Sequence, residues 1–373
     1  MKFTIEQEKF HEGINNVQRA VSSKNTMPIL KGIYLEADQK KGLHLIATDL
    51  ELGIETWISA DIIEEGAIVL PSNYLSNIIR ELPKEEINFK ADLEKYQADI
   101  KCLTSEFNIK GYDPEEFPQL PEVNIPDKLN ISAKKINKLL NEVKFSISND
   151  ESQPALTGAL MEISENNLTM VATNTYRLAF SKINISSENI EKQDEISKII
   201  LPGNTLNELS RLLPDKEEPV EILINSNYSS FNFNNITVLS RLIEGQFPNY
   251  EQVIPDEYNT NITINKRELQ QAVKRASLIA RENSNVISLS TNDNILTIDS
   301  VDSETGKAHE EVEIETEGPE QNINVDADYL LDVFKIIETD KITINLIGPI
   351  NPLTIKKDDN YIYLIMPIRP ENQ

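Results

Sequence analysis

The sequence contains little of several residue types on which enzymes and secreted proteins rely. One of its 373 residues is a cysteine, Cys102, so no internal disulfide can form, which fits a reducing cytoplasm. Glycine occurs 12 times, which makes it about half as frequent as its usual share of roughly 7% of residues. Few glycines are therefore available for phosphate-binding loops. No apolar run approaches the roughly 18 residues of a membrane span. These absences predict a cytoplasmic protein that does not cross a membrane.

The N-terminal sequence MKFTIEQEKF has neither the basic region nor the apolar stretch of a secretory signal. Hydrophobic residues make up 39% of the chain and charged residues 26%, as is typical of a folded globular protein. A chain of 373 residues is too long for one ordinary hydrophobic core. We therefore expect two or three domains.

Catalytic motifs are missing as well. The histidines, His11, His44 and His309, are scattered, and Cys102 has no histidine near it in the sequence. Neither G-x-x-x-x-G-K-[ST] nor G-x-S-x-G occurs. Acidic pairs such as Glu310-Glu311 would suit a two-metal nuclease, but in so acidic a chain we interpret them as solvated surface. We expect no enzyme, no metal site and no cofactor.

What the sequence does contain is an internal repeat. Residues 70–83 (LPSNYLSNIIRELP) and 201–214 (LPGNTLNELSRLLP) agree at seven positions, and a weaker third copy is 325–338 (VDADYLLDVFKIIE). Short β-prone runs precede helical patterns at 3–6, 129–132 and 262–265, and Phe-Pro pairs recur at 117–118 and 247–248. Three such elements in one order indicate three related units.

Proline- and acid-bearing segments near 124–128 and 254–259 separate these units. We predict domains at 1–126, 127–254 and 255–373. Each unit has two helical patterns, and the rest is mostly short alternating β-prone runs, such as 222–224, 231–239 and 342–346. The predicted fold class is α+β, with a domain of two helices plus antiparallel sheets used three times.

The net charge of −25, from 36 basic and 61 acidic residues, argues against a nucleic-acid partner unless the basic residues are segregated. The helical segments 5–22, 71–82, 132–147, 202–213, 265–281 and 326–337 together carry +4, which leaves −29 on the other residues. The alternative explanation for this positive charge is that lysine and arginine are simply good helix formers whose charged ends are solvated. Asp326, Asp328 and Asp332 make the sixth segment an exception. We favour a shared positive surface.

Helical periodicity predicts which residues are buried and which face outward. The buried stripes are Leu75, Ile78, Ile79 and Leu82; Ile136, Leu139, Leu140, Val143 and Ile147; and Leu269, Ala272, Val273 and Ala276. Ser72, Ser76 and Arg80 lie opposite the first of these stripes. On or beside the positive faces, we predict contacts to the phosphates of duplex DNA from Lys24, Arg80, Lys134, Lys138, Lys144, Arg267, Lys274 and Arg281.

Six segments carry a family resemblance that extends over the whole chain in order. They are MKFTIE (1–6), TMPIL (26–30), ATDLE (47–51), ATNTYRL (172–178), GQFPNY (245–250) and YLIMPIR (363–369). With them the chain resembles the bacterial DNA sliding clamp, the β subunit of DNA polymerase III. The resemblance implies a head-to-tail homodimer whose six domains form a ring around double-stranded DNA. It also implies a non-catalytic subunit of the polymerase holoenzyme.

The resemblance further implies a hydrophobic cleft between the second and third units. There the polymerase III catalytic subunit, the clamp loader, other polymerases and repair proteins would each dock a short peptide. Carried over by motif, the cleft residues are Leu156, Thr173, Thr175, Tyr176, Arg177, Leu178, Pro248, Val253, Ile350, Pro352, Leu364, Ile365, Met366, Pro367 and Arg369. The apolar tail YLIMPIR is also consistent with a final core strand, and both interpretations can hold.

The subunit contact is expected between the third and first units, through Phe107, Ile109, Leu278 and Ile279. Leu278 falls outside the buried stripe of its helix, next to Ile279. Phe107 and Ile109 alternate on a short strand that presents an edge. In the family these regions meet, although the apolar patch at 278–279 is also consistent with the core of the third unit.

The sequence departs from the family pattern in three places. Asn174-Thr175 replaces the usual Asp-Gly, so the backbone there is less permissive. Gln153-Pro154 replaces an arginine-bearing segment, which weakens one expected DNA contact, and Pro370–Gln373 extends past the usual end toward the cleft rim. The alternative function is that of an acidic repeat protein that binds proteins without DNA. Salt-sensitive retention on nicked circular DNA, only after a loader acts, would distinguish a clamp.

Overall fold

The computed structural model describes residues 1–22, 27–123, 127–186, 190–191, 198–281, 285–302 and 304–369. Its α-helices are α1 (Gln7–Val17), α2 (Ser72–Glu81), α3 (Ala133–Val143), α4 (Gly203–Leu212), α5 (Lys266–Ala280) and α6 (Ala327–Val333). Short 3-10 helices are η1 (Gln18–Ala20), η2 (Pro28–Lys31), η3 (Pro114–Glu116), η4 (Lys144–Ser146), η5 (Pro154–Leu156) and η7 (Glu251–Val253). Every α-helix lies in a segment where the sequence predicts one.

The remainder of the fold is mostly β-strand, and every pairing between the strands is antiparallel. The first repeat contains β1 (Lys2–Glu6), β2 (Gly32–Asp38), β3 (Gly42–Thr48), β4 (Leu52–Ile58), β5 (Asp61–Glu64), β6 (Gly66–Pro71), β7 (Glu86–Asp92), β8 (Gln97–Cys102) and β9 (Ser105–Lys110). The second contains β10 (Asp127–Ser132), β11 (Gly158–Ile163), β12 (Asn167–Thr173), β13 (Arg177–Asn184), β14 (Ile190–Glu191), β15 (Lys198–Pro202), β16 (Pro219–Ile224), β17 (Tyr228–Phe233) and β18 (Ile236–Arg241). The third contains β19 (Thr260–Asn265), β20 (Val286–Asn292), β21 (Ile295–Asp302), β22 (Gly306–Glu317), β23 (Asn322–Asp326), β24 (Lys341–Leu346), β25 (Leu353–Asp358) and β26 (Tyr361–Ile365).

The strands form three sheets, distributed over two compact units. One unit comprises residues 1–136, 187–196 and 207–242, and it holds a five-stranded sheet (β5-β1-β7-β8-β9) and a nine-stranded sheet (β14-β10-β16-β17-β18-β4-β3-β2-β6). The other comprises 137–186, 197–206 and 243–373, with a twelve-stranded sheet (β15-β11-β12-β13-β26-β25-β24-β19-β22-β21-β20-β23). The second repeat contributes to both units because β18 pairs with β4 of the first repeat and β13 pairs with β26 of the third.

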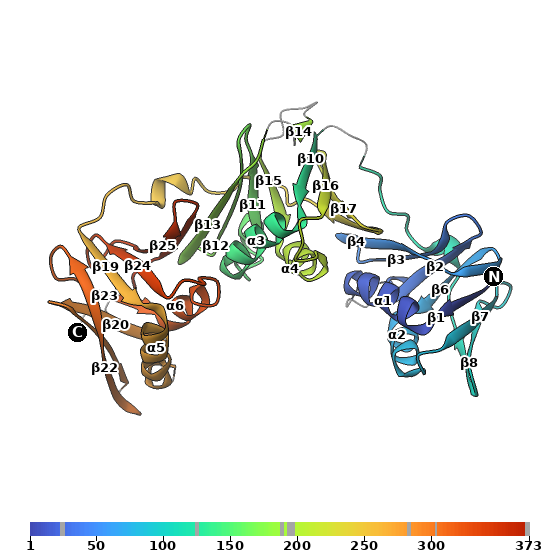
Figure 1. The fold of residues 1–373 in the computed structure, drawn as a ribbon, viewed down its shortest axis with the longest axis horizontal. Helices are drawn as coiled ribbons and strands as arrows, with labels where there is room; N and C mark the ends of the chain where they lie inside the picture. The colour runs from blue at the N-terminus through green and yellow to red at the C-terminus, as the bar shows by residue number, and fades with distance from the viewer. Residues whose placement is uncertain are drawn as a thin grey trace. The chain divides into compact units, whose positions relative to one another are not determined.

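In the first and third repeats the two α-helices pack against each other, α1 on α2 and α5 on α6 (Figure 1). Helix α5 also packs on β20, β21 and β22. It buries Leu269, Ala272, Val273 and Ala276 there, as its periodicity predicts, and leaves Leu278 64% exposed. None of the described helices is long and apolar enough to cross a membrane.

A β-hairpin turn that occurs in the first two repeats shows their relationship at atomic detail. Thr48 donates its hydroxyl to the Leu52 carbonyl at 2.9 Å, and Thr173 donates to the Arg177 carbonyl at 2.7 Å. The next side chain, Asp49 or Asn174, accepts from the amides two and three residues ahead. In the third repeat Asp302 accepts from the amides of Glu304 and Thr305 in the same way.

Three local predictions were wrong or only partly right. The run 231–239 is not one strand, because Asn234, with φ of +51°, turns the chain between β17 and β18. Ser72 is buried instead of facing outward, since α2 begins at Ser72 directly after β6 and its first turn is covered. Ile78 and Ile147 are only half-buried. Cys102 is buried, with its thiol 3.7 Å from the Pro83 carbonyl oxygen, and burial raises the pKa of that thiol.

Candidate functional site

Four of the predicted DNA-contacting side chains are exposed on helix faces. They are Lys134 and Lys138 on α3, and Arg267 and Lys274 on α5. None of the four forms an ion pair with another described residue. Arg267 and Lys274 are two helical turns apart, so they lie on one face of α5. These four cations are available to an external anion such as a phosphate.

The other four predicted contacts are placed less favourably. Arg80 pairs with Glu81 at 3.0 Å, and Arg281, directly after α5, pairs with Asp328 at 3.6 Å. Both pairs are exposed, so their net stabilisation is small. Lys144 lies half-buried in η4 and not on α3. Lys24 lies outside the described residues.

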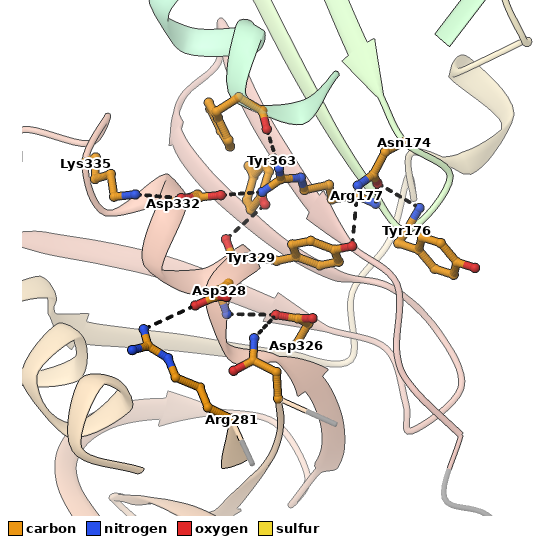
Figure 2. A network of polar contacts seen from close by, with 12 residues as sticks. Asn174, Tyr176, Arg177, Arg281, Asp326, Asp328, Tyr329, Asp332, Lys335 and Tyr363 are labelled. Atoms are coloured by element: carbon orange, nitrogen blue, oxygen red, sulfur yellow. Dashed lines mark hydrogen bonds and ion pairs between the residues drawn. The ribbon is translucent and has the colours of Figure 1, made fainter. Parts of the chain in front are cut away.

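Helix α6 was the acidic exception among the helical segments, and its contacts explain the charge. Asp326 caps the helix by accepting from the Asp328 amide at 2.8 Å, and it also accepts from the Asn285 side chain at 2.7 Å. Asp328 pairs with Arg281. Figure 2 shows Asp332 between two cations, Arg177 at 2.6 Å and Lys335 at 2.7 Å. The carboxylates of α6 are therefore engaged within the chain.

The C-terminal tail forms a core strand, which is one of the two interpretations of its sequence. Strand β26 pairs with β13, where Leu364 lies opposite Leu178 and Ile365 opposite Arg177. Leu364 and Ile365 are 2% and 0% exposed, so they are core residues. Beyond the strand, Met366 is half-buried, and its amide donates to the Tyr176 carbonyl at 2.8 Å. Met366 therefore lies at the boundary between the core and the surface.

An apolar cluster lies where β13 meets β26. Its buried members are Leu160, Val171, Leu178, Ile200, Tyr250 and Leu364, and half-buried Ala155, Phe180, Ile243, Phe247, Ile254 and Met366 pack against them. The structure thus brings together three residues predicted for the cleft, Leu178, Leu364 and Met366. We call these twelve residues the β13–β26 cluster.

The remaining predicted cleft residues divide by exposure. Exposed are Thr175, Tyr176, Pro248, Val253, Ile350 and Arg369, whereas Pro352 and Pro367 are half-buried. Leu156 and Thr173 are buried, and Thr173 uses its hydroxyl in the hairpin turn. Phe247 and Tyr250 were missed, although both belong to the GQFPNY motif and Phe247 precedes the predicted Pro248. Apart from β propensity, nothing in the sequence indicated that Leu160, Val171 and Ile200 belong to this cluster.

Arg177 was predicted as a cleft residue, but its guanidinium is held inside the structure. The side chain is 11% exposed, and its Nη1 donates to Asp332 Oδ2 at 2.6 Å while Nη2 donates to the Phe145 carbonyl. The guanidinium also lies over the Tyr329 ring, 4.6 Å from the centroid. Figure 2 shows Tyr329 and Tyr363 beside it, and burial raises the pKa of the Tyr363 phenol. Arg177 therefore joins β13 to α6.

The turn at Asn174-Thr175 places its second residue in a backbone conformation that favours glycine. Thr175 has a φ of +76°, a left-handed conformation that is strongly unfavourable for a β-branched side chain. Leu50 occupies the same place in the first repeat, with a φ of +78°. The backbone adopts the shape that glycine would permit, and the threonine bears the strain.

We expect Thr175→Gly to stabilise the protein by about 1 kcal/mol. Relief of a left-handed non-glycine residue gains about 1–3 kcal/mol, and the greater freedom of glycine in the unfolded chain offsets about 0.5–1 kcal/mol of it. The urea midpoint of unfolding should therefore rise. Thr237→Gly is the control, because Thr237 lies in strand β18 and should lose stability. A midpoint lowered equally by both changes would exclude strain at Thr175.

No group of three or more His, Cys, Asp or Glu side chains that could hold a metal ion occurs in the part of the chain that the structure describes. His44 contacts Glu55 at 3.0 Å and Glu36 at 3.6 Å, and its ring stacks on Trp57 with centroids 4.1 Å apart. His309 contacts Asp299 and Glu311. The side-chain chemistry of the described residues is that of ion pairs, apolar clusters and exposed helix-face cations.

Comparison with known proteins identifies the family. Models of the N-terminal, central and C-terminal domains of the DNA polymerase III beta subunit match residues 1–121, 130–249 and 251–369. The chain belongs to the DNA polymerase III beta subunit family. A beta sliding clamp of Staphylococcus epidermidis is 34% identical over 99% of both chains. Membership confirms the predicted three-domain clamp fold and a processivity factor that is not itself an enzyme.

Solved structures agree with the family. A DNA polymerase sliding clamp from Bacillus subtilis superposes with a TM-score of 0.93 at 32% identity over 100% of both chains. A DnaN sliding clamp from Pseudomonas aeruginosa bound to griselimycin gives a TM-score of 0.93 at 26% identity, over 99% of this chain and 100% of that one. The fold is therefore shared along the whole length of the chain.

Proposed function

We propose that two copies of this chain close head to tail into a ring that encircles duplex DNA and tethers polymerases and other proteins to it. The observation that carries the proposal is the distribution of charge. In a chain of net charge −25, the exposed cations Lys134, Lys138, Arg267 and Lys274 have no ion-pair partner among the described residues. The carboxylates of α6 are engaged internally instead of neutralising these cations.

A closed ring needs little intrinsic affinity for DNA, because its topology holds the duplex. Lysine and arginine contacts to phosphates carry no sequence information, so the ring can slide. The acidic remainder of the surface repels DNA. The cations of the helices then guide the duplex without reading its bases.

Arg267→Ala combined with Lys274→Ala is expected to weaken the salt dependence of DNA retention. Removal of one phosphate-binding cation makes the slope of log affinity against log salt shallower by about 0.9. The double variant removes two such cations from each subunit of the dimeric ring. The measurement is retention of the loaded ring on nicked circular DNA over a salt series. Lys40→Ala with Lys95→Ala is the control, because both lysines are exposed in turns between strands. An unchanged slope in the α5 variant would contradict the assignment.

The β13–β26 cluster is the proposed docking site for a short apolar peptide of a polymerase, of the clamp loader or of a repair protein. Half-buried Met366 and Phe247 offer adaptable apolar surface, and exposed Tyr176, Val253 and Arg369 border the site in the motif-based assignment. Thioether side chains repack at little cost, which suits a site that accepts different peptides. Since Arg177 is engaged by Asp332, we assign it to holding β13 and assign the rim charge to Arg369.

The proposed domains are 1–126, 127–254 and 255–373, and the three family matches support this division.

For the subunit contact, exposed Phe107 (39%) and Leu278 (64%) are the main candidates. Ile279 is half-buried, and Ile109 is 6% exposed within its own sheet, so both contribute less surface. Replication takes place in the bacterial cytoplasm, where we place the protein.

A further inference from the structure

A buried carboxylate of α4 connects the second repeat to the first. Glu208 is 7% exposed, and it pairs with Arg19 of the first repeat at 3.2 Å. It also pairs with Arg211, three residues further along α4, at 2.7 Å. We call Glu208, Arg19 and Arg211 the first bridge. It joins a helix of one repeat to an arginine of the repeat before it.

The same arrangement connects the third repeat to the second. Asp332 of α6 pairs with Arg177 of the second repeat at 2.6 Å and with Lys335, three residues further along, at 2.7 Å. Glu208 and Asp332 occupy the same position of the internal sequence repeat. We call Arg177, Asp332 and Lys335 the second bridge. The two bridges are therefore equivalent in position and in charge.

The two bridges differ in the origin of their arginine. Arg19 lies in η1, whereas Arg177 is the first residue of β13 and closes the hairpin turn 173–177. At the place of Arg177, the equivalent turn of the first repeat has the apolar Leu52. The second bridge thus includes a residue of the turn itself, and the first bridge does not.

The turn 173–177 supports the β13–β26 cluster. Tyr176 is 61% exposed, and its carbonyl accepts from the Met366 amide at 2.8 Å. Leu178, the residue after Arg177, is a buried member of the cluster. A displacement of Arg177 would therefore shift an exposed aromatic residue, the backbone anchor of Met366 and part of the apolar floor together.

Helix α6 holds this turn at two points, as Figure 2 shows. The Arg177 guanidinium is paired with Asp332 and lies over the Tyr329 ring, 4.6 Å from the centroid. The Asn174 side-chain amide donates to the Tyr329 hydroxyl at 3.4 Å. In the described part of the chain, Asp332 is the one carboxylate that pairs with Arg177. Since the arginine side chain is 11% exposed, loss of Asp332 would leave a largely buried cation unpaired.

We propose that Asp332 and Tyr329 are positioning residues of the docking site, which hold the turn 173–177 in the conformation that the peptide binds. The inference rests on the proposed docking function of the β13–β26 cluster. The turn contains Thr175 in its left-handed conformation, which persists where surrounding contacts fix it. A site that is already held in its bound conformation costs less to order when the peptide arrives, so the second bridge raises the affinity.

Asp332→Asn is expected to weaken binding of a polymerase-tail peptide about ten-fold, or by about 1.4 kcal/mol, because it removes the charge that holds Arg177. Asp332→Glu keeps the charge and should retain most of the affinity. In a chain that already carries Arg177→Gln, Asp332→Asn should have little further effect, since it acts through the arginine. Isothermal titration calorimetry of the peptide against each variant measures these differences.

Glu208→Gln is the matched control, because it removes the equivalent carboxylate of the first bridge. Both Glu208→Gln and Asp332→Asn should lower the urea midpoint of unfolding, but Asp332→Asn alone should weaken the peptide. An equal loss of affinity in both variants would mean that the effect is a general loss of stability. That result, or an unchanged affinity in a folded Asp332→Asn, would overturn the inference and leave the second bridge a structural contact.

Tyr329→Leu provides a second route to the same loosening should Asp332→Asn fail to fold. It removes the ring beneath the guanidinium and the hydroxyl beside Asn174, and it leaves the ion pair in place. Loss of the cation–π contact should weaken the peptide about three-fold. An unchanged affinity here would contradict a positioning role. If the unsubstituted protein itself does not bind the peptide, the proposed docking function fails, and the inference fails with it.

Discussion

Phe107→Ala together with Leu278→Ala is expected to convert the dimer into folded monomers at micromolar concentration. Phe107 is 39% and Leu278 64% exposed in the single chain, so their truncation leaves the core of each domain intact. In the proposed head-to-tail dimer, Phe107 on β9 of the first domain and Leu278 on α5 of the third domain belong to the surfaces that meet at the subunit contact. Apolar anchors of this kind contribute about 2 kcal/mol or more each, and the proposed ring has two such subunit contacts. Sedimentation velocity measures the outcome.

The control for this dissociation is Ile63→Ala with Ile295→Ala. These side chains are 48% and 40% exposed, and β5, which carries Ile63, lies at the opposite end of its sheet from β9. The control should remain dimeric. If the variant with Phe107→Ala and Leu278→Ala also remains dimeric with an unchanged melting temperature, Phe107 and Leu278 are not interface anchors. The exposure of Leu278 already shows that it does not complete the core of the third domain.

Periodicity predicted the helices well because a helix that packs on a sheet must bury one stripe of side chains. On α5 every predicted core residue is buried, and the residue outside the stripe, Leu278, is exposed. The same rule failed at Ser72, because periodicity carries no information about the start of α2 immediately after β6. Helix faces are thus predictable in the interior of a helix and less so in its first turn.

The acidity of α6 was not interpretable from the sequence because its explanation lies in contacts between distant residues. Asp332 meets Arg177 across 155 positions of the chain, and Asp328 meets Arg281 across 47. No local pattern encodes such pairs. The cleft shows the same limit: motifs supplied Leu178, Leu364 and Met366, but Leu160, Val171 and Ile200 join them only through the pairing of the sheet.

Met366→Ala is expected to weaken binding of a polymerase-tail peptide by about 1–3 kcal/mol, as for a hot-spot anchor, with dimerisation unchanged. The side chain is half-buried against the β13–β26 cluster, so it offers surface to a ligand while its backbone is fixed by the Tyr176 carbonyl. Truncation removes the thioether and leaves that hydrogen bond in place. Isothermal titration calorimetry of the peptide against both proteins measures the change, starting from micromolar affinity, or about −8 kcal/mol.

Ile368→Ala is the matched control, because Ile368 lies two residues further along the same tail, is 36% exposed, and is anchored through its amide to the Asn324 carbonyl at 2.8 Å. It lies outside the β13–β26 cluster, so the peptide should bind this variant with unchanged affinity. A core role and a binding role for Met366 have opposite signatures. Core packing predicts a lower melting temperature with equal peptide affinity, whereas docking predicts a reduced affinity with little change in melting. Equal affinities in Met366→Ala and the unsubstituted protein would leave Met366 a core residue.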